Sequence, residues 1–182
     1  MDGQQQENER AAHGADCIRV SNLMDAAFLA DFRHTVDRSA ERLLALTDAE
    51  AAARPAPSKW SPKEIVGHLI DSASNNHGRF VRAQLQDDMT SSGYEQDDWV
   101  RVQAYQERTW PDLVLLWQAF NHHIAHVMEA AAAEALVTPR ARHNLNALAW
   151  QPPGDGQPAT LEYFMRDYVG HLKHHLRQAL AE

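Results

Sequence analysis

Histidine is the residue type in this sequence whose spacing could do chemistry. Three of the eleven histidines lie within five positions near the carboxyl end, in the stretch GHLKHHLRQ, residues 170–178. If this stretch is helical, His171 and His175 lie one turn apart on one face and could present two imidazoles to one ion. His174 projects at another angle. The alternative is a solvated helix surface, which spacing alone does not exclude.

A second pair, His122 and His126, has the same spacing and competes with the first. The phase of each pair on its helix separates them. The pair near the carboxyl end shares its face with Tyr168 and Asp167, a mixed apolar and polar surface that we expect to look into a helical bundle. His122 and His126 follow the edge of an apolar stripe instead. We therefore assign metal binding to the first pair and keep His123 as a residue that could line a pocket.

A third ligand must come from another segment, because a catalytic metal site takes three protein donors and keeps one position open. His68 is the best candidate. Ser72, Asn75 and Arg79 follow it at four, seven and eleven residues, so in a helix they continue its face as an unusually polar ridge. Such a ridge is either the solvent side of a helix or the wall of a pocket between helices.

Four amphipathic helices would position these residues. Each is indicated by apolar residues that recur at steps of three and four. Ser61, Pro62 and Glu64 predict a capping box with proline in the first turn, and Thr160 can cap the last helix. The four predicted helices cover residues 22–46, 62–86, 111–135 and 160–180.

Two long polar connections separate the second helix from the third and the third from the fourth. The first of them contains a short helix within residues 97–108, and the second is rich in proline and glycine. The alternating period of a strand is not evident. The pattern predicts an all-α protein, a four-helix bundle with long crossover connections.

Composition and charge exclude several classes of function. The formal net charge is −8, with 17 basic residues scattered among 25 acidic ones, which argues against a nucleic-acid partner. No apolar run is long enough to cross a bilayer, so we expect no membrane partner. Cys17 is the only cysteine and no hydrophobic signal segment precedes it, which predicts a cytoplasmic protein. Residues 1–20 are predicted to be a disordered or loosely attached leader, and residues 21–182 one domain.

Three segments together resemble the DinB/YfiT-like superfamily of metalloenzymes and are most similar to its YfiT branch. They are WSPKEIVGHLIDSASNNHGRF (60–80), GYEQDDW (93–99) and TLEYFMRDYVGHLKHHLRQ (160–178). The resemblance implies a DinB/YfiT-like four-helix bundle that binds one divalent metal ion, zinc or nickel, through three histidines. Carried over by position, these ligands are His68, His171 and His175. The resemblance also implies a homodimer.

The resemblance further implies chemistry on a small-molecule substrate. Members with an assigned activity are mostly transferases that join a low-molecular-weight thiol (bacillithiol, mycothiol or glutathione) to an electrophile, and others are named hydrolases. We expect a metal-dependent thiol S-transferase acting in detoxification or stress response. The alternatives are a hydrolase that uses a metal-bound hydroxide and a non-catalytic metal-binding bundle. A fourth protein donor, such as Asp71 or His174, would favour the last, because structural zinc sites are closed.

Arg79, Asn75 and Tyr168 are the other candidate site residues. Arg79 could hold a carboxylate of the thiol, Asn75 or Asn76 could donate a hydrogen bond to it, and Tyr94 or Tyr168 could act near the leaving group. Each has an alternative role in packing or on a helix surface.

Overall fold

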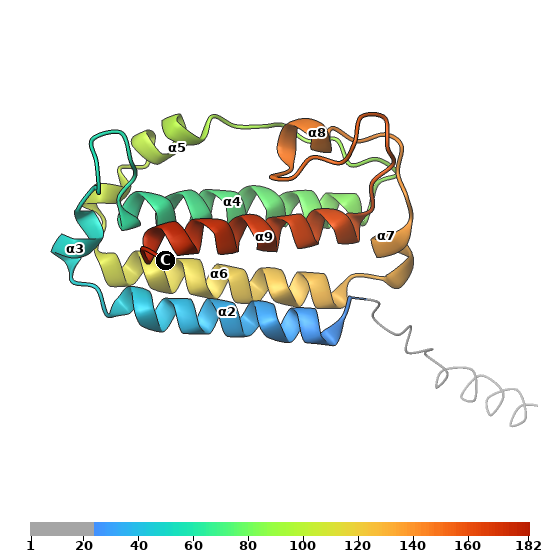
Figure 1. The fold of residues 1–182 in the computed structure, drawn as a ribbon. Helices are drawn as coiled ribbons and strands as arrows, with labels where there is room; N and C mark the ends of the chain where they lie inside the picture. Colours follow the sequence, from blue (N-terminus) through green and yellow to red (C-terminus); the bar gives the residue numbers. More distant parts are fainter. Residues whose placement is uncertain (1–23) are drawn as a thin grey trace, which may run out of the picture.

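Four long helices run side by side in the computed structural model, which describes residues 24–182 (Figure 1). The predicted leader and Cys17 lie outside the described residues. The long helices are α2 (Ala26–Leu44), α4 (Pro62–Ala83), α6 (Trp110–Ala130) and α9 (Leu161–Ala179). The shorter ones are α3 (Asp48–Ala52), α5 (Gln96–Val102), the 3-10 turn η1 (Tyr105–Glu107), α7 (Ala133–Val137) and α8 (Leu145–Leu148).

The two helices that carry the candidate ligands begin where the capping residues predict. At the start of α4 the Ser61 side chain accepts from the Glu64 backbone N–H, and the Glu64 carboxylate accepts from the Ser61 N–H at 2.9 Å. At the start of α9 the Thr160 hydroxyl accepts from the Tyr163 N–H at 3.1 Å. A fixed start sets the rotational phase of the residues that follow, so these caps help to determine which way the histidines point.

Some helix boundaries differ from the prediction. The third long helix ends at Ala130 rather than near residue 135, because Ala131 and Ala132 take extended conformations, with ψ of 134° and 139°, before α7 begins. The sequence analysis also missed α3, although Thr47 and Glu50 form a complete capping box at its start. Helices of four or five residues, such as α3, α7 and α8, are too short to produce a recognisable period.

The first long connection determines the topology. Residues 84–109 carry the chain from one end of the bundle to the other, so α4 and α6 run in the same direction, whereas α2 and α9 run the opposite way (Figure 1). The second connection, residues 131–160, leaves and returns at the same end. Helix α4 packs against both α6 and α9, and α2 packs against α6. As a result, α4 and α9, which are far apart in the sequence, lie antiparallel beside each other.

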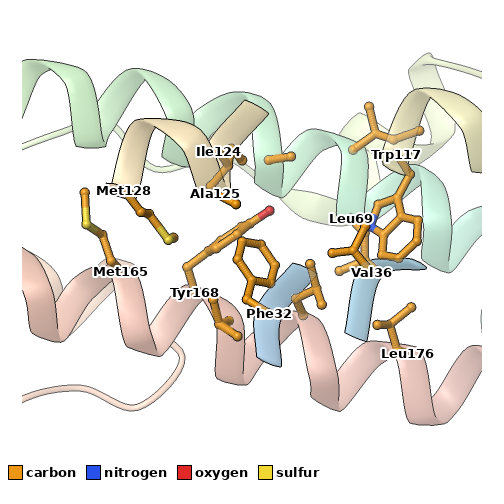
Figure 2. Packing of buried hydrophobic residues seen from close by; sticks show 14 of the residues in the cluster. Phe32, Val36, Leu69, Trp117, Ile124, Ala125, Met128, Met165, Tyr168 and Leu176 are labelled. Atoms are coloured by element: carbon orange, nitrogen blue, oxygen red, sulfur yellow. The ribbon is translucent and has the colours of Figure 1, made fainter. Parts of the chain in front are cut away.

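Apolar side chains from all four long helices form the core (Figure 2). Phe80 packs edge to face on Phe164 and Tyr168, with ring centroids 5.5 and 5.8 Å apart. Each fully buried large side chain contributes about 1.5–3 kcal/mol by leaving water. The bundle is therefore held together by apolar packing. Fully buried members of the core include Phe32, Val36, Trp117, Ile124, Met128, Met165 and Leu172.

One isolated bridge joins the two long connections, and another lies within the second connection. Met89 bridges to His143 and Arg140 bridges to Ala159, but no strand forms within residues 24–182. Among the described helices, none has both the length and the apolar character needed to span a membrane.

Candidate metal centre

Helices α4 and α9 bring His68, His171 and His175 together. One ring nitrogen from each lies within 4.8 Å of the others, and Nε2 of His68 is 3.3 Å from Nε2 of His171. Two imidazoles bonded tetrahedrally to one zinc ion would hold their nitrogens about 3.4 Å apart. The separation of the His68–His171 pair matches that value, and a nitrogen of His175 lies within 4.8 Å of both, so the donor set suits a divalent cation.

Burial keeps these three imidazoles neutral. His68 is only 2% exposed, and its removal from water, together with the nearby His175, lowers its pKa to about 3. Burial and the neighbouring histidines also lower the pKa of His171 to about 3, and burial lowers the pKa of His175. A neutral imidazole offers a lone pair to a metal and a protonated one does not. At neutral pH the cluster is therefore in its ligating form.

Gln178 fixes the orientation of His175. The Nδ1–H of His175 donates to Oε1 of Gln178 at 2.8 Å, and the Gln178 amide nitrogen donates to Nε2 of His174 at 3.0 Å. With its proton on Nδ1, His175 keeps the Nε2 lone pair for the cluster, as metal-binding histidines commonly do. Sequence reasoning missed Gln178, although its position three residues after His175 places it on a neighbouring part of the same helix surface.

A glycine directly precedes His68 on α4 and another directly precedes His171 on α9. A Cβ atom on Gly67 would overlap the ring of Tyr105, and one on Gly170 would lie 3.1 Å from the ring of Trp150. The absence of a side chain lets these aromatic residues lie directly on α4 and α9 beside the cluster. The tripeptide Gly-His-Leu, which occurs at both places, is the sequence signal that could have predicted this arrangement.

The two residues considered as a fourth donor are engaged elsewhere. Oδ1 of Asp71 accepts from the Tyr105 hydroxyl at 2.6 Å and from the Gln103 amide. His174 is bonded to Gln178, and its ring lies 5.4 Å from that of Trp150. In the part of the chain that the structure describes, the cluster therefore consists of three histidines without a fourth protein ligand.

A cavity of about 260 Å³ adjoins the cluster and is lined by His68 and His171. Its lining residues come from α4 and α9 and from the two long connections. Ser91 and Asn144 join these two connections. The Ser91 backbone N–H donates to Oδ1 of Asn144 at 3.1 Å, and the Asn144 amide nitrogen donates to the Ser91 backbone carbonyl at 2.7 Å. The Asp167 carboxylate on α9 accepts from two backbone N–H groups of the second connection, those of Trp150 and Gln151, at 2.9 and 2.8 Å.

Of the predicted polar residues on α4, Arg79 lines this cavity and Asn75 does not. The Asn75 amide donates to the backbone carbonyl of Asp71 at 2.9 Å, and Asn76 lines the cavity in its place. Helix phase explains the difference. At about 100° per residue, Asn76 lies about 80° to one side of His68, whereas Asn75 lies about 20° to the other side. The cavity extends toward α9 on the Asn76 side.

Tyr168 forms part of the cavity wall, but its hydroxyl is committed to the core. The Tyr168 side chain lies among the core residues (Figure 2). Its hydroxyl donates to Oδ1 of Asn121 at 2.6 Å, and burial raises the pKa of Tyr168 far above its usual range. Tyr94 also lines the cavity. Burial, together with the negative charge of the nearby Asp71, raises the pKa of Tyr94 to about 12. Tyr94 is thus the better placed of the two tyrosines to meet a ligand.

The competing histidines on α6 do not converge. Nε2 of His122 lies 2.7 Å from an oxygen of Asp37 on α2. His123 does not line the cavity beside the cluster, because it faces His77 on another side of α4, with their Nε2 atoms 3.3 Å apart. The ring of His126 is 6.5 Å from that of His123.

Comparison with known proteins agrees with this architecture. Residues 31–179 match the family model of the DinB superfamily. A solved structure of YfiT from Bacillus subtilis superimposes with a TM-score of 0.65 over 86% of each chain, at 16% sequence identity. It is described as a probable metal-dependent hydrolase with an unusual four-helix bundle topology. At this identity the similarity shows the fold alone, and it confirms the predicted bundle. None of the curated proteins compared with this chain matches it.

Proposed function

The chain belongs to the DinB superfamily, and we propose that it is a metal-dependent enzyme in which His68, His171 and His175 hold one divalent ion, zinc or nickel. The observation that carries this proposal is the convergence of three neutral imidazoles without a fourth protein donor in the described chain. Structural zinc sites are closed by four protein ligands, whereas catalytic ones keep a position for water or substrate. The adjoining cavity would give a substrate access to that position.

The reaction we propose is S-transfer, in which a low-molecular-weight thiol attacks an electrophilic carbon. A divalent ion in this site would favour the thiolate form of a thiol that binds it. The residues of the cavity suit this chemistry. The acidic residue that lines it, Asp167, accepts two backbone hydrogen bonds and so holds the second connection on α9. Tyr94, with its raised pKa, would stay protonated and could donate to a leaving group.

A hydrolase is the second candidate, because the similar fold of YfiT is described as a probable metal-dependent hydrolase. The same three histidines would serve either reaction. The two candidates differ in their second substrate, which is a thiol in one case and water in the other.

Metal analysis of protein prepared without a histidine tag, followed by assays with small thiols and a chromogenic aryl halide, tests the proposal. We expect about one divalent ion per chain and thiol-dependent turnover that His171→Ala abolishes. His123→Ala, which removes a histidine outside the cluster, is the matched control. Hydrolysis of model esters without any thiol requirement would favour the hydrolase. Unchanged turnover in folded His171→Ala would contradict both enzymatic proposals.

A further inference from the structure

Arg79 is a buried cation without an anionic partner in the described chain. Its side chain is 6% exposed and lines the cavity beside the cluster. The guanidinium donates to the backbone carbonyl of Ser92 at 2.8 Å and to the Asn76 amide oxygen at 3.3 Å, and both acceptors are neutral. Asp88, which lines an outer pocket together with Arg79, is paired with Arg142 at 3.0 Å. Burying an unpaired charge is unfavourable, so this arrangement needs a reason.

The surroundings hold the guanidinium in place and leave donors free. On α4, the Asn76 amide donates to the carbonyl and hydroxyl oxygens of Ser72, which orients its own oxygen toward Arg79. On the other side, the Ser92 carbonyl belongs to the connection that covers the cavity. An arginine has five N–H donors in a planar fork, and two are used here. The remaining donors suit a carboxylate, which can accept two parallel hydrogen bonds.

The position of Arg79 relative to His68 sets the length of a ligand that could reach both. Eleven residues of α-helix bring the chain back to nearly the same face, about 16 Å further along the axis. Because the side chains of both residues lean toward the amino end of the helix, their functional groups stay separated along the axis as their Cα atoms are. A ligand joining the two must therefore be extended.

From this geometry we propose that Arg79 forms an anion subsite that selects carboxylate-bearing thiols over neutral thiols, with the carboxylate on the guanidinium and the sulfur at the histidine cluster. This inference rests on the proposed S-transfer function. A carboxylate would neutralise the buried charge, whereas an uncharged ligand would displace water from Arg79 without replacing its hydrogen bonds. The selectivity would thus come from the penalty that a neutral thiol meets as well as from attraction to the charged one.

Glutathione and its diethyl ester are suitable probes, because they share the thiol and most of the framework but differ in carboxylate charge. Dissociation constants from calorimetry and KM values from the transfer assay would be measured for each. In the unaltered protein we expect glutathione to bind at least about 10-fold more tightly than the diester, as charge-assisted hydrogen bonds allow. Arg79→Met should abolish this ratio, and Arg79→Lys, which keeps the charge without the fork, should retain part of it.

Arg82→Met is the matched control, since Arg82 is an exposed arginine on the same helix outside the cavity that contains the cluster. It should keep the full ratio. Equal binding of both probes to the unaltered protein, or a ratio that survives in Arg79→Met, would overturn the subsite and assign Arg79 to holding the Ser92 connection. Transfer with both thiols at equal efficiency would leave the proposed function standing without the subsite. Arg79-dependent glutathione binding without any transfer would contradict the proposed function and support the subsite.

Discussion

Two histidine groups in this protein share one distance and differ in almost everything around it. In the cluster, His68 on α4 faces His171 on α9 with Nε2 atoms 3.3 Å apart. In the surface pair, His77 on α4 faces His123 on α6 with the same separation. The cluster adds a third imidazole, His175, within 4.8 Å. The surface pair lacks a third ligating group at that distance among the described residues. Proximity of two imidazoles is therefore insufficient to identify a metal site.

The residues that support the histidines show the same contrast. In the cluster, Gln178 fixes the tautomer of His175 and the ring of Trp60 lies 5.1 Å from that of His68. In the surface pair His123 is exposed, whereas no histidine of the cluster is. Rigid support lowers the entropy lost when a ligand binds, so preorganisation distinguishes the cluster from the surface pair more clearly than distance does.

Removing one histidine from each group should give the largest difference. Loss of His171 should weaken metal binding by more than about 100-fold, which is the upper range for changes to the supporting residues of a site. His123→Ala should change the affinity less than about 2-fold, because the surface pair does not form the tight site. Competition with a chromogenic chelator measures both. Equal losses in the two variants would show that the surface pair is the principal site.

Altering the glutamine beside the cluster should have the next largest effect. We expect Gln178→Leu to weaken metal binding by about 10–100-fold, because His175 loses the acceptor that orients it. Gln178→Glu, which keeps an acceptor, should restore most of the affinity. Gln118, which donates to Asp37 near His122, is the matched control, and Gln118→Leu should leave the affinity unchanged. An effect of Gln118→Leu as large as that of Gln178→Leu would argue against this role.

The bundle and the convergence of the three histidines were accessible from the sequence because period, caps and phase are properties of single helices. Ser61 and Thr160 mark the starts of α4 and α9, and His171 and His175 are related by one helical turn. The comparisons confirm the predicted family and fold. The assignment of the histidines as metal ligands stays a prediction.

The cavity was less accessible because the long connections complete it. Asn75 was preferred to Asn76 since the sequence does not tell on which side of the His68 ridge α9 packs. The bonds between Ser91 and Asn144 join residues 53 positions apart, and no local pattern predicts such a contact. The role of Gln178 also depends on the orientation of one imidazole, which only the packed structure gives.

The glycines next to each group offer a test of stability. Gly67 precedes His68, and a methyl group there would displace Tyr105 from α4 and break its hydrogen bond to Asp71. We expect Gly67→Ala to lower the free energy of unfolding by about 2 kcal/mol. Gly78 follows His77, and its added Cβ would meet only the mobile end of Arg82, 3.2 Å away. Gly78→Ala should raise the free energy of unfolding by up to about 1 kcal/mol through helix propensity. Urea denaturation measures both, and equal destabilisation would contradict the packing described for Tyr105.

Acidification of the metal-free protein should give the smallest effect. The folded-state pKa values of His68 and His171 lie near 3, below the usual value of 6.5, so unfolding takes up protons between these limits. The neutral histidines make their full contribution to the free energy of unfolding above pH 6.5, and this contribution is lost as the pH falls. Each should contribute a loss of roughly 1 kcal/mol between pH 6.5 and 5.5. Denaturation at several pH values gives the free energy of unfolding as a function of pH. His171→Ala should make this dependence shallower, and an unchanged dependence would contradict the neutral buried cluster.

Anomalous diffraction at the metal absorption edge, from crystals of the tag-free protein loaded with zinc or nickel, tests the central claim most directly. We expect one strong peak bonded to nitrogens of His68, His171 and His175, at about 2.0–2.1 Å for zinc, with at least one position filled by a non-protein ligand. A principal peak at His77 and His123, or a protein side chain as fourth ligand of the cluster, would contradict an open catalytic site.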